Sequence, residues 1–132
     1  MTAVPLVSIV DDDDNVRMAT GGLVETLGYD VETFESCEAF LGSEVLDKTR
    51  CLITDVQMRG MSGPELQEDL INFGKNIPVI FITAFPSDRT RARVTERGAI
   101  AYLTKPFDRA TLQKRIKLAL GDERNVPRSG KS

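Results

Sequence analysis

The stretch CLITDVQM, residues 51–58, decides the fold, because its apolar run ends at a single carboxylate, Asp55. An apolar run of this length predicts a strand that is buried in a sheet. Open α/β folds bind their ligands beyond the carboxyl ends of the strands, which is where Asp55 would lie. We therefore expect Asp55 to be the centre of the functional site.

Strands and helices alternate along the chain around this central run. The predicted strands cover residues 6–10, 29–34, 50–54, 77–83 and 100–103. The predicted helices, with their capping residues, cover residues 14–28, 36–46, 62–74, 86–98 and 108–120. Five repeats of strand then helix predict a parallel sheet with helices on both faces and right-handed crossovers. The expected fold class is a doubly wound α/β domain with a five-stranded parallel sheet and five helices.

Polar residues mark the starts of the predicted helices. Asp14 is the expected N-cap of the first helix, and Asp108 is that of the last. Ser62, followed three residues later by Glu65, has the pattern of a capping box. The residues expected on the buried face of this third helix are Leu66, Leu70 and Phe73.

Charge is distributed unevenly along the chain. Residues 1–84 carry 5 basic and 15 acidic side chains, net −10, whereas residues 85–120 carry 9 basic and 3 acidic ones, net +6. Such a split predicts separate surfaces for separate partners. The helix expected over 86–98 has Ala92 and Val94 as its apolar residues, which predicts that it is loosely held. Because its arginines come with no nucleic-acid motif, we expect no direct binding of nucleic acid.

Length and composition indicate one cytoplasmic domain. The 132 residues suffice for a single core, placed at residues 1–120, and the unpatterned residues 121–132 predict a disordered tail or a truncated linker. There is no run of about 18 apolar residues and no signal-peptide pattern, so neither a membrane span nor export is expected. Cys37 and Cys51 lack metal-ligand spacing and are expected to be ordinary core residues rather than a disulfide.

The strand ends bring five polar side chains to one edge of the predicted sheet. They are Asp11 and Asp12 after the first strand, Asp55 after the third, Thr83 at the end of the fourth and Lys105 after the fifth. Three close carboxylates repel one another unless a cation lies among them, and an all-oxygen ligand set suits Mg²⁺ before Ca²⁺. A lysine and a hydroxyl beside such an ion form a pocket for a phosphoryl group. With no Ser, Cys or His nucleophile among these residues, the implied chemistry is formation of an aspartyl phosphate.

Five motifs, in this order, resemble one known family. They are IVDD, ITDVQM, MSGPELQ, IPVIFITA and AYLTKPF, and the resemblance covers about residues 5–120. The pattern is similar to the receiver domain of two-component response regulators, in the FixJ-like branch that precedes a helix-turn-helix output. The resemblance implies a CheY-like, flavodoxin-like fold with the strand order 2-1-3-4-5. It also implies a signalling protein that catalyses only its own phosphoryl transfer and slow autodephosphorylation.

The resemblance assigns roles to the acidic residues by position. Asp55 resembles the phosphoacceptor, which would take its phosphoryl group from the phosphohistidine of a sensor histidine kinase or of a phosphotransfer protein. Asp12 resembles a direct Mg²⁺ ligand, and Asp11 resembles one that acts through water. Asp55 itself and the backbone carbonyl of Gln57 would complete the metal site.

The resemblance also implies a switch. Lys105 resembles the residue that pairs with the acceptor and then with the phosphate, and the Lys105–Pro106 bond would be cis. Thr83 and Tyr102 resemble the switch pair, in which the hydroxyl moves to the phosphate and the ring turns inward behind it. The readout surface would be the fourth helix, fifth strand and fifth helix, which would control homo-oligomerisation or a partner.

Three features depart from the family pattern. Arg59 follows Met58 where the family usually has Met-Pro, so this loop would be more mobile or would present Arg59 to a partner. Phe85 would hinder the attacking water and lengthen the life of the phosphorylated state. The chain shows no output domain after about residue 120, so it would be a stand-alone receiver or a fragment of a transcriptional regulator.

Three other functions fit parts of the pattern. A degenerate receiver would act only as an interaction module, although all five site residues are present. A phosphatase of the haloacid dehalogenase type also uses Asp, Thr, Lys and Mg²⁺, but that chemistry needs an acid where Gln57 stands. A flavin-binding fold has the same topology, but the acidic residues after the first strand would repel the flavin phosphate.

Overall fold

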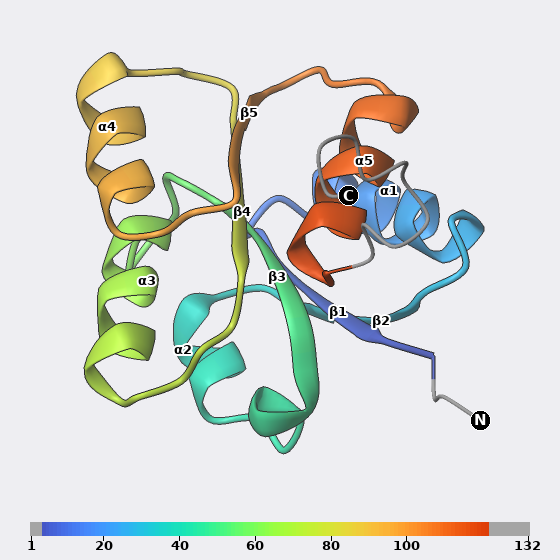
Figure 1. The fold of residues 1–132 in the computed structure, drawn as a ribbon, viewed down its shortest axis with the longest axis horizontal. Coiled ribbons are helices and arrows are strands. Elements are labelled where there is room, and N and C mark those ends of the chain that lie inside the picture. Colours follow the sequence, from blue (N-terminus) through green and yellow to red (C-terminus); the bar gives the residue numbers. More distant parts are fainter. Residues whose placement is uncertain (1–3, 122–132) are drawn as a thin grey trace, which may run out of the picture.

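The computed structural model describes residues 4–121 and shows one parallel sheet with helices on both faces (Figure 1). The sheet has the order β2-β1-β3-β4-β5, and all neighbouring strands are parallel. The strands are β1 (Leu6–Val10), β2 (Asp30–Phe34), β3 (Thr49–Asp55), β4 (Val79–Thr83) and β5 (Ala101–Thr104). The predicted fold class and strand order are confirmed, and the bounds of the strands differ from those predicted by at most about two residues.

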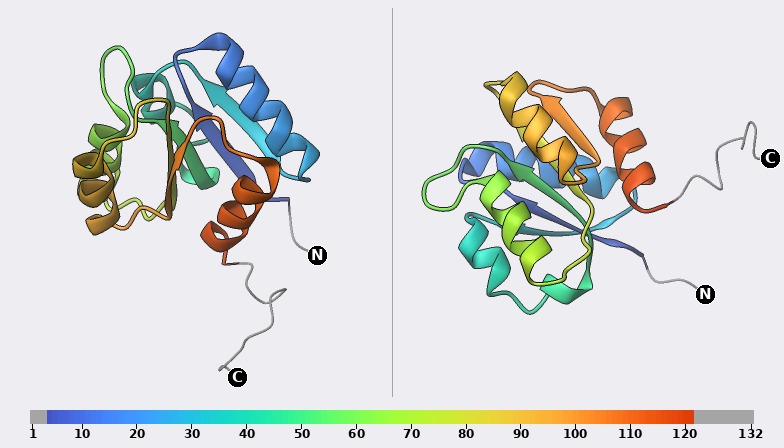
Figure 2. Two further views of the ribbon diagram at one scale, coloured as in Figure 1. Left: turned by 90° about the horizontal axis from the view of Figure 1, so that it is seen from above. Right: turned by 60° about the vertical axis from the view of Figure 1, so that its left-hand side comes forward.

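Five helices cover the sheet, with α1 and α5 on one face and α2, α3 and α4 on the other (Figure 2). They are α1 (Asp14–Thr26), α2 (Cys37–Leu41), α3 (Gly63–Asn72), α4 (Asp88–Glu96) and α5 (Arg109–Ala119). Because side chains alternate along a strand, β3 serves both faces: Cys51 and Ile53 pack toward α1 and α5, and Leu52 packs on the opposite side. Burial on both faces explains why the central run is continuously apolar.

Side-chain caps begin α3 and α5 as predicted. The Ser62 hydroxyl accepts a hydrogen bond from the backbone N–H of Glu65, and the Glu65 carboxylate accepts one from the backbone N–H of Ser62. This is a complete capping box. Asp108 caps α5 by accepting a hydrogen bond from the N–H of Thr111 at 2.7 Å.

The start of α1 differs from the prediction. Asp13, and not Asp14, is the N-cap, and its carboxylate accepts a hydrogen bond from the backbone N–H of Val16 at 3.0 Å. Four consecutive aspartates offer equivalent local signals, so the end of β1 decides which of them caps the helix. Asp11 is buried just past that end, and Asp13 keeps the extended conformation of an N-cap.

Two predictions about helix extent and burial are wrong. α2 has only five residues, with Gly42 as its C-cap, and a separate 3-10 turn follows at Leu46–Lys48. Leu66 and Leu70 of α3 are buried as predicted, but Phe73 is 60% exposed. Phe73 is already the C-cap of α3, so its side chain lies beyond the end of the buried face.

Three further predictions concern thiols, membrane spans and the tail. Cys37 and Cys51 are free and buried, as predicted, and burial raises the pKa of each thiol to about 12. Within residues 4–121 no helix has the length and apolar character needed to cross a membrane. The tail predicted over residues 121–132 lies outside the described residues after Gly121.

Candidate functional site

The carboxyl ends of the strands meet at one edge of the sheet, as the parallel topology requires. The last paired residues of β1 and β3 are neighbours, so Asp11 and Asp55 are brought together. β4 ends at Thr83, and the backbone N–H of Lys105 donates to its carbonyl at 2.8 Å. Residues that lie far apart in the sequence therefore form one pocket.

Three carboxylates lie together in this pocket. One oxygen from each of Asp11, Asp12 and Asp55 lies within 4.8 Å of the others. Asp11 is fully buried, and the side chains of Asp55 and Asp12 are 13% and 23% exposed. Oxygen donors that remain partly open to water suit Mg²⁺, which keeps several of its own water ligands. The residues present therefore fit a hard divalent cation.

Lys105 brings a positive charge to the carboxylates. Its Nζ donates to Oδ2 of Asp11 at 3.3 Å and lies 3.7 Å from Oδ2 of Asp55. The Lys105–Pro106 bond is cis, as the resemblance implies. A buried carboxylate without a nearby cation is costly, so Lys105 allows Asp11 to stay fully buried.

Burial raises the pKa of Asp55 above its ordinary value, and the negative charge of Asp11 raises it further. The positive charge of Lys105 lowers this pKa, as does the backbone N–H of Val56, which donates to Oδ1 of Asp55 at 2.8 Å. The net result is a carboxyl group that binds a proton more readily than a free aspartate does. A cation among the carboxylates would favour the charged form and oppose this shift.

Backbone contacts hold the pocket in place, and sequence analysis does not point to them. Oδ1 of Asp11 accepts a hydrogen bond from the N–H of Asp13 at 2.9 Å, and the Asp11 carbonyl accepts one from the Arg17 guanidinium at 2.8 Å. Gly63 lies directly against Asp55, because a Cβ at position 63 would be 2.3 Å from the Asp55 carbonyl oxygen. Only glycine fits between α3 and the end of β3.

The two predicted switch residues both bond to the loop between β4 and α4. Oγ1 of Thr83 accepts a hydrogen bond from the N–H of Phe85 at 3.0 Å, and the Tyr102 hydroxyl accepts one from the N–H of Ser87 at 3.1 Å. The guanidinium carbon of Arg91 lies 5.0 Å from the centre of the Tyr102 ring, a cation–π contact. The loop therefore connects the end of β4 to both α4 and β5.

Arg59 contacts the pocket in a way that the sequence does not reveal. Its backbone N–H and its Nε donate to the same oxygen, Oδ2 of Asp12, at 3.0 and 3.4 Å. Gln57, whose carbonyl is a predicted metal ligand, is exposed in the same loop. The departure from Met-Pro singles out Arg59, but a contact across 47 positions has no local signal.

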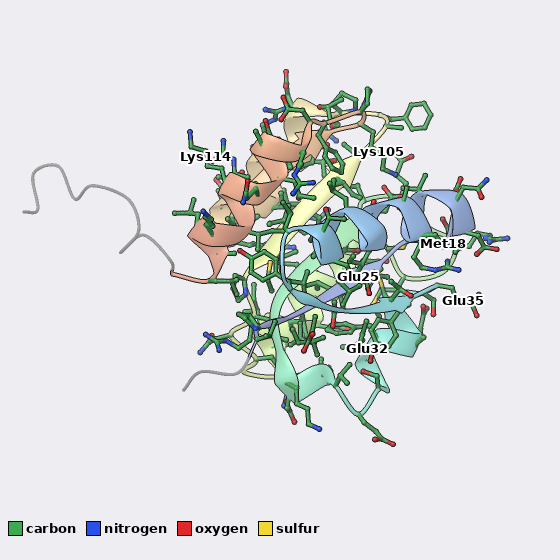
Figure 3. The ribbon with its side chains drawn as sticks, turned by 90° about the vertical axis from the view of Figure 1, so that its right-hand side faces the viewer. Met18, Glu25, Glu32, Glu35, Lys105 and Lys114 are labelled. Atoms are coloured by element: carbon green, nitrogen blue, oxygen red, sulfur yellow. The ribbon has the colours of Figure 1, made fainter. Side chains whose placement is uncertain are left out.

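The labelled glutamates and lysines of Figure 3 come from different elements. Glu25 and Glu32 lie beside α1 and β2, whereas Lys114 projects from α5 and Lys105 lies at the end of the sheet near β4 (Figure 3). Lys105, from the basic part of the sequence, nevertheless lies beside Asp11 and Asp55, so the two parts of the chain meet at the pocket.

A five-stranded parallel sheet in this order, with an acidic pocket and a lysine at its carboxyl edge, defines the CheY-like class of α/β proteins. Residues 7–117 match the family model of the response regulator receiver domain, and the chain belongs to this family. Receiver domains are signalling modules of two-component systems rather than metabolic enzymes. They generally bind Mg²⁺ at an acidic pocket and are generally phosphorylated by histidine kinases.

Relatives and solved structures agree with this assignment. The transcriptional regulatory protein FixJ of Azorhizobium caulinodans is 36% identical over 115 residues, 87% of this chain and 54% of FixJ. The response regulator protein TodT of Pseudomonas putida is 35% identical over 127 residues, 93% of this chain and 56% of TodT. The chain thus spans about half the length of these curated relatives. The crystal structure of FixJ-N has a TM-score of 0.82 at 32% identity and covers 92% of this chain and 96% of its own.

Proposed function

We propose that this chain is a phosphorylation-controlled switch in which Asp55 accepts a phosphoryl group from the phosphohistidine of a kinase. The position of Asp55 carries the proposal. Its carboxylate is partly open to solvent at the end of the central strand, 3.7 Å from the ammonium of Lys105 and clustered with two further carboxylates. This arrangement supplies a nucleophile, a positive charge and metal ligands in one pocket.

In the proposed step, an oxygen of the Asp55 carboxylate attacks the phosphorus of the phosphohistidine. A P–O bond forms as the P–N bond breaks, and the electron pair stays on the imidazole nitrogen, which leaves as neutral imidazole once protonated. The product is a mixed anhydride on Asp55. Burial and Asp11 raise the pKa of Asp55, and nearby positive charge favours the ionised form of the nucleophile.

Asp11, Asp12 and Asp55, with the backbone carbonyl of Gln57, would hold Mg²⁺, Asp11 acting through water. When bound, Mg²⁺ would offset the negative charge of the carboxylates and of the phosphoryl oxygens. Lys105 lies close enough to Asp55 to pair next with the transferred phosphoryl group. The three carboxylates and Lys105 therefore act together as an anion-accepting site in spite of their own negative charge.

The proposed output begins at Thr83. Its hydroxyl now accepts a hydrogen bond from the N–H of Phe85 and would turn to the phosphoryl group, which releases that N–H. Tyr102 bonds to Ser87 of the same loop, so a change in the loop would reach the ring and α4. The readout surface would be α4, β5 and α5, which would control self-association or a partner.

The first experiment is intact mass spectrometry after incubation with Mg²⁺ and acetyl phosphate. We expect the mass to rise by one phosphoryl group. The gain should disappear with Asp55→Asn and with EDTA, because the first removes the nucleophile and the second removes the cation. Asp30→Asn is the matched control, since Asp30 is an exposed aspartate at the start of β2, at the opposite edge of the sheet.

Other outcomes of the same experiment support the alternatives. No gain in mass under any condition would contradict the switch and favour a receiver that acts only as an interaction module. Steady release of phosphate without a stable adduct would favour a phosphatase. Size-exclusion chromatography of the phosphorylated sample then tests the proposed self-association through α4, β5 and α5.

A further inference from the structure

Arg59 places two hydrogen-bond donors on one carboxylate oxygen of the acidic pocket. Its backbone N–H lies 3.0 Å from Oδ2 of Asp12, and its Nε lies 3.4 Å from the same atom. The Asp12 side chain is partly exposed, whereas the Arg59 side chain is 88% exposed. The guanidinium therefore reaches the pocket from solvent and is not packed into the fold.

Neither contact is possible with the Met-Pro sequence that Met58-Arg59 replaces. Proline has no backbone N–H to donate and carries no charge. The loop is held at a second point close by, where the N–H of Met61 donates to the Glu38 carboxylate at 3.1 Å. The positive φ of 77° at Gly60 lets the backbone turn between these two attachments. The loop is therefore anchored in a way that keeps Arg59 beside Asp12.

We propose that Arg59 competes with Mg²⁺ for Asp12 and so sets the Mg²⁺ concentration at which the pocket fills. The inference rests on the proposed function, because it takes Asp12 as a ligand of the ion. In the metal-free protein the guanidinium partly neutralises Asp12, which lies within 4.8 Å of two other carboxylates. Arg59 thus lowers cation affinity without being a ligand itself.

Electrostatics gives the direction of the effect. A divalent cation close to Asp12 is repelled by a guanidinium on the same oxygen, and that oxygen has less negative charge to offer. Because the arginine side chain is largely in water, it can leave Asp12 when the ion arrives, so the effect is competition and not exclusion. Solvent screening keeps it moderate.

The test is isothermal titration of Mg²⁺ into the metal-free full chain at fixed ionic strength. We expect Arg59→Ala to lower the dissociation constant of Mg²⁺ by about three- to tenfold. Arg59→Lys, which keeps the charge, should remain within about twofold of the unmodified protein. Arg50→Ala is the matched control, because this exposed arginine near the start of β3 lies at the other edge of the sheet and its loss changes the net charge equally.

A second measurement separates competition from a purely structural contact. Thermal unfolding in EDTA should show that Arg59→Ala lowers Tm, because the carboxylates lose a counter-charge, and Mg²⁺ should then raise Tm more than in the unmodified protein. An unchanged or higher dissociation constant in Arg59→Ala would overturn the inference while leaving the metal site intact. No binding of Mg²⁺ by the unmodified chain would overturn the proposed metal site and this inference together.

Discussion

The acidic pocket and helix α4 are built in opposite ways. Each pocket carboxylate accepts a hydrogen bond from a backbone N–H: Asp11 from that of Asp13, Asp12 from that of Arg59, and Asp55 from that of Val56. β1 and β3, which lead to these carboxylates, are largely buried. In α4, by contrast, Val94 is the one fully buried side chain.

Polar contacts also attach α4 to the rest of the protein. The amide of Gln67 on α3 donates to the Val94 carbonyl at 3.0 Å, and Ser87 caps the helix start. An ion pair between Arg97 and Glu68 is long, at 3.6 Å, and surface pairs of this kind contribute little. The small buried apolar surface of α4 is the basis for the prediction that this helix is loosely held.

The difference fits the division of tasks in the proposed switch. A site for phosphoryl transfer needs groups held in place before the reaction, because their ordering then costs nothing during it. An element that must respond to that reaction needs a low cost of displacement, and regions with little buried apolar surface have it. The predictions below test whether the pocket is rigid and α4 is not.

Gly63→Ala should have the largest effect, because Gly63 lies against the rigid acidic pocket. Its Cβ would meet the Asp55 carbonyl at 2.3 Å, and we expect a loss of about 3 kcal/mol in the free energy of unfolding, measured with urea. Gly22→Ala is the control within α1. There is open space around Gly22, so alanine should stabilise the protein by about 0.5–1 kcal/mol. Equal effects of the two changes would contradict the assignment of a rigid pocket.

Val94→Ala should be milder and local to α4. Loss of two buried methyl groups is expected to cost about 1–2 kcal/mol, since one small side chain is removed from the core. Hydrogen exchange should show the largest loss of protection in α4, with the amides of β3 changed only as far as global stability requires. If protection falls uniformly, α4 unfolds together with the sheet and the two regions are not distinct.

Asp55→Asn should have a smaller effect of opposite sign, raising the stability of the metal-free protein at neutral pH. The folded-state pKa of Asp55 is raised by burial and by Asp11, so the native state binds its proton more tightly than the unfolded state does. The free energy of unfolding therefore falls as pH rises from the unfolded-state pKa to the folded-state pKa. Above the folded-state pKa this loss of stability is complete. Urea unfolding in EDTA should show a higher free energy of unfolding for Asp55→Asn at pH 7, and no difference below the ordinary pKa of aspartate. A gain that is independent of pH would contradict this origin.

Phe85→Asn should have the smallest effect, a change in the rate of phosphoryl loss. Phe85 lies in the loop between β4 and α4, where the pocket meets the helix. Phe85 is 72% exposed beside Thr83, and an apolar ring there would keep water from the phosphoryl group. We expect the asparagine variant to lose its phosphoryl group about two- to fivefold faster, followed by intact mass. Phe73→Asn removes another exposed ring at the end of α3 and should leave the decay rate unchanged. Equal rates of phosphoryl loss in the two variants would show that Phe85 does not slow this reaction.

Much of the fold and of the candidate site was predictable from local sequence patterns. The capping box at Ser62 and Glu65 and the N-cap at Asp108 were predictable because a cap involves residues three apart. The placement of Asp55 was predictable because a buried strand must be apolar and its end can be polar. Parallel topology then predicts that the strand ends converge, as they do at Asp11 and Lys105.

Tertiary structure alone decided the remaining features. It selected Asp13 over Asp14 as the cap of α1, left Phe73 exposed, pressed Gly63 against Asp55 and placed Arg59 on Asp12. The first three depend on where β1, α3 and β3 end, and the contact of Arg59 with Asp12 depends on where two distant segments lie in space. The sequence by itself determined which segments form strands and helices and which polar residues end them, because those choices depend on neighbours within about four positions. Contacts across dozens of positions exist only after the sheet has assembled, so their partners cannot be read from local pattern.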